Sequence, residues 1–508
     1  MIRWLSALLT GLAFALAFPL TESFTGLPWL AWVALIPLGL AILPGRPGQA
    51  FWVGWLAGTL AYLAIFAWVV IVMQAYGKLP LTTSLLLLLL LAAYVGLYVG
   101  LFAAGWRWCA ARWPQWSWLL APALWVALEW LRGHLLSGFP WALLGYSQYR
   151  QLEVIQIADL TGVYGVSFVM VAVNVALTGV LDGLIERRAR TAFLSLAAAL
   201  VLVAATLGYG HWRIAEVGAA LEPGPRVGLI QGNIPQELKW DPSMRRTTLE
   251  RYERLTRQAA TEGAELIIWP EASAPFMFEE EPDYQQTIRS LAATTGRALL
   301  FGSPAIAQRE GTAKLLNSAY LLNPDGTTQA RYDKLHLVPF GEYVPLGPLL
   351  GFVDKLVVGI GDFAPGRGPV QMEAAGRPLG LAICFEIIFP ELVRQLPQHG
   401  ARVIATITND AWFGRSAAPL QHFSMAVFRA VEHRTPVVRA ANTGISGVIT
   451  ATGAIARTSD LFVEAVLVEP VAITQIRTLY TRVGDIFAVA CGILVAIFIV
   501  IGRRATRS

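Results

Sequence analysis

The stretch Gly380-Leu381-Ala382-Ile383-Cys384-Phe385-Glu386 places a cysteine directly after a short apolar segment and directly before an acid. The chain has three cysteines, and Cys384 is the one that lies outside the apolar runs, since Cys109 and Cys491 lie in or beside them. A single cysteine at the end of a strand is a candidate nucleophile if a base and a cation can reach it. The alternative is a buried structural thiol, which is the more common fate of a single cysteine.

The composition around this stretch is that of a membrane protein. Of 508 residues, 55% are hydrophobic and 14% are charged, with a mean hydropathy of +0.54, whereas a soluble protein carries roughly 25% charged residues. The length leaves room for a globular domain beside the spans. The net charge of +5 is small, and no basic stretch with interleaved aromatics indicates nucleic acid. The six histidines are scattered and none lies near a cysteine pair, so we expect no metal and no cofactor.

Eight apolar runs are long enough to span a bilayer, which takes about 20 residues as a helix. Seven precede a long globular segment and one follows it: 4–20, 27–43, 50–74, 82–106, 117–136, 162–184, 192–212 and 484–502. We therefore predict a membrane domain over residues 1–212, a globular domain over residues 213–483, and a C-terminal transmembrane helix with its tail over residues 484–508.

The arginines beside these runs predict the orientation. They fall on one face of the membrane when the runs alternate in direction: Arg3, Arg46, Arg107, Arg112, Arg187, Arg188, Arg190, Arg503, Arg504 and Arg507. The positive-inside rule makes that face cytoplasmic, so the globular domain lies on the other side. In a bacterium that side is the periplasm, and we predict a multi-pass protein of the inner membrane with a periplasmic catalytic domain.

The globular segment alternates short β-rich runs with amphipathic helices, a pattern that favours parallel strands with function at their carboxyl ends. Three further polar residues are predicted to lie at strand ends, as Cys384 does. Glu271 follows the apolar run 266–270, Lys334 lies in the segment 331–342, and Asn409 follows the run 403–407. We expect these ends to meet at one rim.

These motifs together resemble those of a known superfamily. The nitrilase superfamily has a Glu, a Lys and a Cys motif, and this chain has three similar motifs in the same order. They are Trp269-Pro270-Glu271, Lys334 with Pro339-Phe340-Gly341-Glu342 downstream, and Ile383-Cys384-Phe385-Glu386. Within that superfamily the chain resembles the bacterial apolipoprotein N-acyltransferases. The features that indicate this are the multi-span N-terminal half, the single C-terminal span and the segment Gln231 to Gln236. This resemblance implies an α/β nitrilase-like αββα sandwich joined to a polytopic α-helical membrane domain of about eight transmembrane helices.

The resemblance also implies an activity. The family moves an acyl chain from a phospholipid to the α-amino group of the lipid-modified N-terminal cysteine of an apolipoprotein, as the last step of lipoprotein maturation. Cys384 would carry the acyl chain as a thioester, Glu271 would be the general acid and base, and Lys334 would stabilise the oxyanion. Glu342 would keep the lysine charged, and Glu386 would be a supporting residue on a mobile loop that lines the pocket.

Five residues are candidates for binding substrate. Trp240 lies in a loop after the first strand and either packs the domain against the membrane or serves as a lid or lipid contact. Phe385 stands where a tyrosine is common in related sequences. Because phenylalanine has no hydroxyl, the remaining roles are packing or contact with the acyl chain. Asn409 would shape the pocket, and Trp412 and Phe413 would give it an apolar wall. For Asp410 we predict a role in forming a local turn. For the apolar segment 353–360 we predict contact with lipid.

The expected partners are a phospholipid donor, with phosphatidylethanolamine preferred, a diacylated apolipoprotein acceptor and the membrane lipids, with the chain acting as a monomer. A membrane-anchored nitrilase-like amidase that hydrolyses a small amide would use the same three residues with water as the acceptor. A catalytically inactive lipid-binding scaffold or transporter is the alternative of another class. Eight spans exceed what an anchor needs, and the intact Glu271, Lys334 and Cys384 argue against loss of activity.

Overall fold

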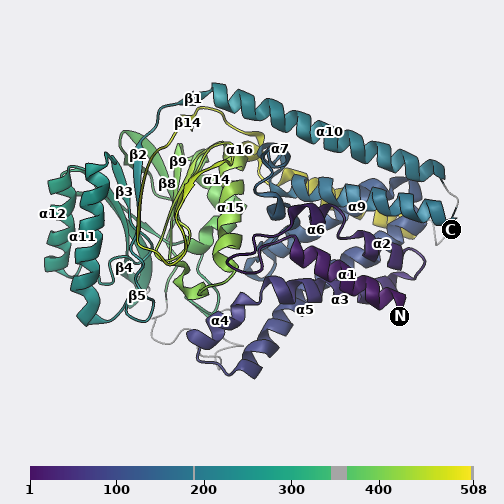
Figure 1. Cartoon of the computed structure of the whole chain (residues 1–508), viewed down its shortest axis with the longest axis horizontal. Helices are drawn as coiled ribbons and strands as arrows, with labels where there is room; N and C mark the ends of the chain where they lie inside the picture. The colour runs from purple at the N-terminus through teal and green to yellow at the C-terminus, as the bar shows by residue number, and fades with distance from the viewer. Residues whose placement is uncertain (187–188, 310, 345–362, 505–508) are drawn as a thin grey trace.

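The computed structural model describes residues 1–186, 189–309, 311–344 and 363–504. It has an α/β part, built mainly from the middle and late parts of the chain, and a helical part that contains both termini (Figure 1). The apolar segment 353–360 and the arginines Arg187, Arg188 and Arg507 lie outside the described residues, so the predictions made for them remain predictions.

Two six-stranded sheets form the centre of the α/β part. One has the order β13 (Ala465–Pro470), β2 (Arg226–Gln231), β3 (Leu266–Ile268), β4 (Ala298–Arg309), β5 (Thr312–Leu322) and β6 (Thr328–Asp333). The other has the order β12 (Ile455–Thr458), β11 (Gly447–Ile449), β10 (Val437–Ala441), β9 (Val403–Thr408), β8 (Arg377–Ile383) and β7 (Met372–Ala374). The strands β2, β3 and β4 are parallel, as are β8, β9 and β10.

Each sheet is buried on both faces, which is why its parallel strands are nearly continuous apolar runs. Leu229 and Ile268 of the first sheet and Leu381 and Ile407 of the second belong to one core between the sheets. The helices α11 (Arg245–Thr261) and α12 (Pro282–Thr295) pack on the outer face of the first sheet. The helices α14 (Pro390–Gln398) and α15 (Ala418–His433) pack on the second. The predicted αββα sandwich is confirmed.

Helices occupy every predicted apolar run. They are α1 (Ile2–Leu16), α2 (Ile36–Ile42), α3 (Pro47–Ile65), α4 (Trp68–Ala75), α5 (Leu81–Arg112), α6 (Ser117–His134), α9 (Val163–Glu186), α10 (Ala189–Ala219) and α17 (Ile486–Arg504). The run 50–74 is divided between α3 and α4, and the run 27–43 begins with the 3-10 helix Pro28–Trp32 before α2.

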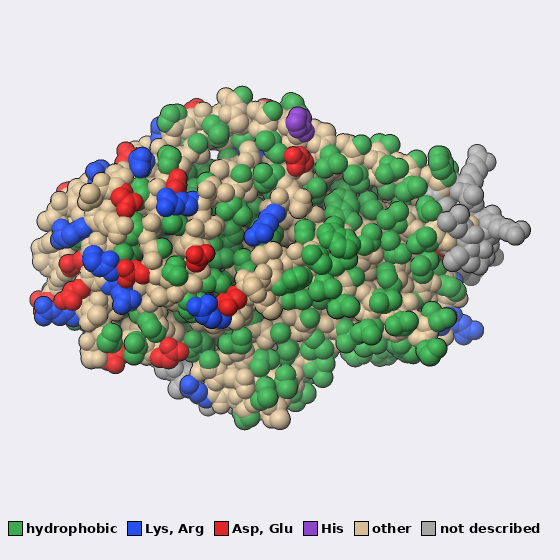
Figure 2. Space-filling model, viewed as in Figure 1, with side chains coloured by type: hydrophobic (Ala, Val, Ile, Leu, Met, Phe, Trp, Pro, Cys, Tyr) green, Lys and Arg blue, Asp and Glu red, His purple; other side chains and the backbone are tan. Residues whose placement is uncertain are grey.

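Four helices in the described part of the chain are long and apolar enough to cross a membrane: Pro47–Ile65, Leu81–Arg112, Val163–Gly183 and Phe193–Ala219. Three shorter apolar helices cover Ile2–Leu16, Pro28–Ile42 and Ile486–Gly502. Hydrophobic side chains dominate the surface of this helical part, whereas lysines, arginines and acids gather over the α/β part (Figure 2). The chain therefore has a membrane domain, and the number of about eight spans stays a prediction.

The helix α15 joins the two parts. Every residue from Ala418 to His433 except Leu420 is buried, because α15 lies between the second sheet and the membrane helices. The Gln421 amide donates to the carbonyls of Pro19 and Ile65 and accepts from the indoles of Trp68 and Trp141. A buried group with every donor and acceptor paired fixes a contact in one geometry.

A buried ion cluster strengthens the same junction. Arg434, directly after α15, approaches Asp159 with 2.9 Å between Nη2 and Oδ2, and Arg213 of α10 donates to the same oxygen at 2.6 Å. Asp159 lies in the short helix α8 (Ala158–Thr161), and both it and Arg434 are almost fully buried. Buried charges are tolerated when they are paired, so this cluster binds the α/β part to the membrane domain at a defined place.

Candidate active site

Cys384 begins a 3-10 helix, Cys384–Ile388, directly after β8. Its φ is +53°, a left-handed conformation that is unfavourable for a residue with a side chain. Two contacts hold this strained turn. The Ile383 N–H donates to Glu386 Oε2 at 2.6 Å, and His422 Nε2 donates to the Cys384 carbonyl at 3.1 Å. A sharp turn from strand to helix presents a nucleophile at the end of a sheet.

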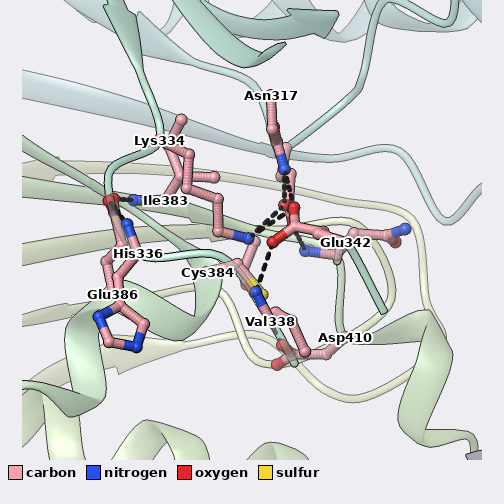
Figure 3. Close-up of polar contacts among 12 residues, drawn as sticks. Asn317, Lys334, His336, Val338, Glu342, Ile383, Cys384, Glu386 and Asp410 are labelled. Atoms are coloured by element: carbon pink, nitrogen blue, oxygen red, sulfur yellow. Dashed lines mark hydrogen bonds and ion pairs between the residues drawn. The ribbon is translucent and has the colours of Figure 1, made fainter. Parts of the chain in front are cut away.

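Lys334 follows β6 and points its amine at two carboxylates beside Cys384 (Figure 3). The distance from Lys334 Nζ to Glu342 Oε1 is 3.0 Å, and that to Glu271 Oε1 is 3.5 Å. The Asn317 amide donates to the same two oxygens at 2.8 and 2.7 Å, and the Val338 N–H donates to Glu342 Oε2 at 2.7 Å. The structure thus brings together Glu271, Lys334, Glu342 and Cys384 as the sequence predicted.

The electrostatics set the resting protonation of these groups. Burial by itself would lower the pKa of Lys334, but Glu342 and then Glu271 raise this pKa above its ordinary value, so the amine stays charged. Burial raises the pKa of the Cys384 thiol, and the Glu271 carboxylate raises it further, while Lys334 opposes both. The thiol is therefore protonated at neutral pH and needs a base before it can attack.

Glu271 is placed to be that base. It follows the strand β3, and its Oε2 accepts a hydrogen bond from the Asn409 N–H at 2.9 Å. Its Oε1 contacts Asn317 and Lys334, so three donors from different parts of the chain, one inside β5 and two directly after β6 and β9, orient one carboxylate. Sequence reasoning missed Asn317, because an asparagine inside the β5 strand carries no local signal of a role in a site.

Glu386 corrects one prediction. It does not lie on a loop that lines the pocket: it is fully buried in the turn that Cys384 begins. Its Oε1 accepts hydrogen bonds from the Leu335 N–H at 2.6 Å, the His336 N–H at 3.1 Å and the Tyr332 hydroxyl at 2.9 Å. Burial raises the pKa of Glu386 to about 7, against the lowering effect of these donors. The carboxylate ties the turn of the nucleophile to the segment of Lys334.

The segment after β9 also differs from its prediction. Asn409 is 4% exposed and bonded to Gln236 at 2.7 Å and to Asn442 at 3.1 Å, so it has a positioning role, and its part in shaping the pocket stays a prediction. Asp410 does more than form a turn. Burial would raise its pKa, but Arg439, at 2.7 Å, and His422 hold that pKa well below its usual range.

The aromatic candidates lie in three places. Trp412 packs edge-on against Tyr76, and Phe413 packs against Trp68, with centroids 4.8 and 5.0 Å apart. This places both of them at the junction with the helix α4. Phe385 packs in an aromatic group with His336 and Phe389.

Trp240 is 40% exposed, in the loop after β2. Its neighbour Lys239, which the sequence reasoning overlooked, is buried in the site. Among the described residues, no group of three His, Cys, Asp or Glu side chains is arranged to hold a metal ion.

Comparisons with known proteins agree with this geometry. A carbon-nitrogen hydrolase family model matches residues 226–480, which contain all the residues of the site, and the model of the apolipoprotein N-acyltransferase N-terminal domain matches residues 9–176. The sandwich and its Glu–Lys–Cys grouping thus define a carbon-nitrogen hydrolase domain carried by a membrane domain.

Relatives over nearly the whole chain give the family. An apolipoprotein N-acyltransferase of Geobacter metallireducens is 47% identical over 96% of this chain and 93% of its own length. One of Vibrio vulnificus is 34% identical over 92% of this chain and 93% of its own length. A solved amidase from Nesterenkonia sp. is 19% identical, with a TM-score of 0.38 over 51% of this chain and 93% of that one. The chain belongs to the apolipoprotein N-acyltransferase family and is an acyltransferase.

Removing the carboxylate in Glu386→Ala leaves three main-chain N–H groups and a buried hydroxyl without their acceptor. Each unpaired group costs about 1–3 kcal/mol, so we expect the free energy of unfolding to fall by about 3 kcal/mol or more. Thermal unfolding in detergent measures this, with Glu250→Ala as the control, because the Glu250–Arg246 pair is exposed and contributes little. Equal unfolding temperatures for the two variants would contradict the positioning role.

Proposed function

We propose that this chain transfers an acyl chain from a phospholipid, through a thioester on Cys384, to the α-amino group of the diacylglyceryl-modified N-terminal cysteine of an apolipoprotein. One observation carries the proposal: a charged lysine held by two carboxylates lies beside a buried thiol, next to a junction with membrane helices. The names of the relatives supply the acceptor.

In the first half-reaction Glu271 accepts the thiol proton, and the Cys384 sulfur attacks the carbonyl carbon of the ester. The carbonyl electron pair moves to oxygen, and the charged Lys334 stabilises the resulting oxyanion. The oxyanion collapses, the ester C–O bond breaks, and Glu271 returns the proton to the departing lysophospholipid alkoxide. Glu342 and Asn317 keep Lys334 and Glu271 in place throughout.

In the second half-reaction the amine of the acceptor attacks the thioester carbonyl. Glu271 accepts a proton from the amine, Lys334 again stabilises the oxyanion, and the Cys384 thiolate leaves. That thiolate recovers a proton from Glu271, which restores the resting site. The product is an amide, and the reaction follows a ping-pong order, because the first product leaves before the acceptor reacts.

The aromatic contacts support lateral access for lipid. Trp412 and Phe413 follow the strand β9 and pack against Tyr76 and Trp68 of the membrane domain. The segment that positions Glu271 through Asn409 therefore continues directly to the membrane junction. A site at this junction admits acyl chains from the bilayer and keeps the thioester away from bulk water.

The finer assignments belong to the same proposal. The membrane domain covers residues 1–212, the catalytic domain 213–483, and the last transmembrane helix with its tail 484–508, with about eight spans in total. The arginine distribution supports an inner-membrane protein whose catalytic domain lies in the periplasm. Phosphatidylethanolamine as the donor and a monomeric enzyme rest on the family resemblance.

Incubation of the full-length enzyme with phosphatidylethanolamine labelled in its acyl chain should place the label on Cys384, because the thioester precedes the acceptor. Mass analysis should find an adduct that hydroxylamine removes, that Cys384→Ala lacks and that Cys491→Ala retains. Phosphatidylglycerol should label the enzyme more slowly. A diacylated lipopeptide should then take the label on its free amine. Release of the label only as fatty acid would favour the hydrolase and contradict the transferase.

The orientation is tested by cysteine labelling in a Cys384→Ala background, since the other two native cysteines, Cys109 and Cys491, are buried. Arg257→Cys on α11 and Gln115→Cys between α5 and α6 both place a thiol at an exposed position. An impermeant maleimide added to intact spheroplasts should label the first variant, and the second only after permeabilisation. The reverse pattern would place the catalytic domain in the cytoplasm.

A further inference from the structure

Lys239 is a second buried lysine in the active site. It is 2% exposed, and its Nζ donates to the main-chain carbonyl of Glu271 at 2.9 Å. Among the described residues this is the hydrogen bond that its ammonium makes, although an ammonium carries three donors. A lysine is rarely buried unless its charge is paired with another group. The partner here is the residue proposed to be the general base.

Lys239 also belongs to a closed ring of hydrogen bonds. Its own N–H donates to the Gln236 carbonyl, and the Gln236 side chain accepts from Asn409 Nδ2 at 2.7 Å. The Asn409 N–H then donates to Glu271 Oε2 at 2.9 Å. Lys239 therefore holds the main chain of Glu271 while Asn409 holds its carboxylate. The residue after Glu271, Ala272, has a φ of +47°, so this turn needs such support.

The net charge of the groups around the thiol also indicates a role for Lys239. Lys334 faces two carboxylates, Glu271 and Glu342, which leaves the group with one negative charge in excess. A buried site tolerates an uncompensated charge poorly. The ammonium of Lys239 balances this excess. The charge of Glu386 also raises the pKa of Lys334. Glu386 needs no further cation, because three main-chain N–H groups and the Tyr332 hydroxyl already donate hydrogen bonds to its carboxylate.

We propose that Lys239 is a positioning residue of the acylation step, which anchors the main chain of Glu271 and supplies the second positive charge of the catalytic group. This inference rests on the proposed transfer through Cys384. When the proton passes from the sulfur to Glu271 and the sulfur attacks, the negative charge moves first to the thiolate and then to the ester oxygen. With Lys239 charged, the group stays neutral overall at each stage, so the developing oxyanion meets no excess of negative charge.

The charge of Lys239 is also sensitive to pH. Burial lowers the pKa of Lys239 to about 8, against the raising effect of Glu271 and Cys384, which among the described residues are the titratable groups that act on it. Lys239 is charged below that pH and becomes neutral above it. Acylation of Cys384 therefore declines as the pH rises through about 8, whereas Lys334, whose pKa lies above its ordinary value, stays charged.

The test compares the full-length wild type with Lys239→Met, Lys239→Arg and the control Lys314→Met, which alters a lysine of β5 outside the site. The first readout is the rate of acyl transfer from labelled phospholipid to Cys384 from about pH 6 to about pH 10. We expect Lys239→Met to slow this step about ten- to hundredfold at pH 7 and to remove the decline above about pH 8. Lys239→Arg should restore much of the rate and move the decline to higher pH, and Lys314→Met should match the wild type.

The second readout is alkylation of Cys384 by iodoacetamide at pH 7, which needs no phospholipid. We expect Lys239→Met to be alkylated about tenfold more slowly than Lys314→Met. A wild type that is alkylated but never acylated counts against the proposed function, and the alkylation rates still decide the role of Lys239. Equal alkylation of the two variants, or a slowed Lys239→Met whose decline with pH is unchanged, overturns the inference. If Lys239→Met does not fold, an unchanged pH profile in Lys239→Arg overturns it.

Discussion

The contact of the Lys334 ammonium with two buried carboxylates is the constraint on which the site depends. A charged amine inside a protein must be paired, and the pairing with Glu342 at 3.0 Å and Glu271 at 3.5 Å fixes all three side chains at once. The same contact keeps the lysine charged while the buried thiol of Cys384 stays neutral. A neutral thiol, a carboxylate and a permanent cation are the groups that acyl transfer through a thioester requires.

The sandwich supplies these groups because each one follows a different strand. Glu271 comes after β3, Lys334 after β6 and Cys384 after β8, and the two sheets that carry them are packed face to face. The helix α15 then ties the second sheet to the membrane helices through Gln421 and through the Arg434–Asp159 ion pair. The position of the site relative to the membrane helices is thus part of the fold, which suits the proposed transfer between lipid substrates.

The sequence predicted the residues whose position follows from a local pattern. Glu271 and Cys384 stand at the ends of apolar runs, Lys334 precedes the motif Pro339-Phe340-Gly341-Glu342, and the membrane helices coincide with apolar runs. It did not predict Asn317 or Lys239, because their roles arise from contacts between distant segments, such as the Lys239 bond to the carbonyl of Glu271. It misplaced Glu386 for the same reason: a carboxylate that accepts three hydrogen bonds from a distant part of the chain looks in sequence like an acid beside a nucleophile. The helices interrupted between Ile65 and Trp68 and before Ile36 show why the span count also needs more than hydropathy.

The most direct test of the account is whether Glu271 and Lys334 act on Cys384 as one unit. A double-mutant cycle with Glu271→Gln and Lys334→Met, read as the rate of the first acyl transfer to Cys384 in a single turnover, measures their coupling. Because the two groups share one contact and serve one transition state, the double variant should be about as slow as the slower single variant. If the two losses multiply as for independent residues, the base and the cation act separately and the central claim is wrong.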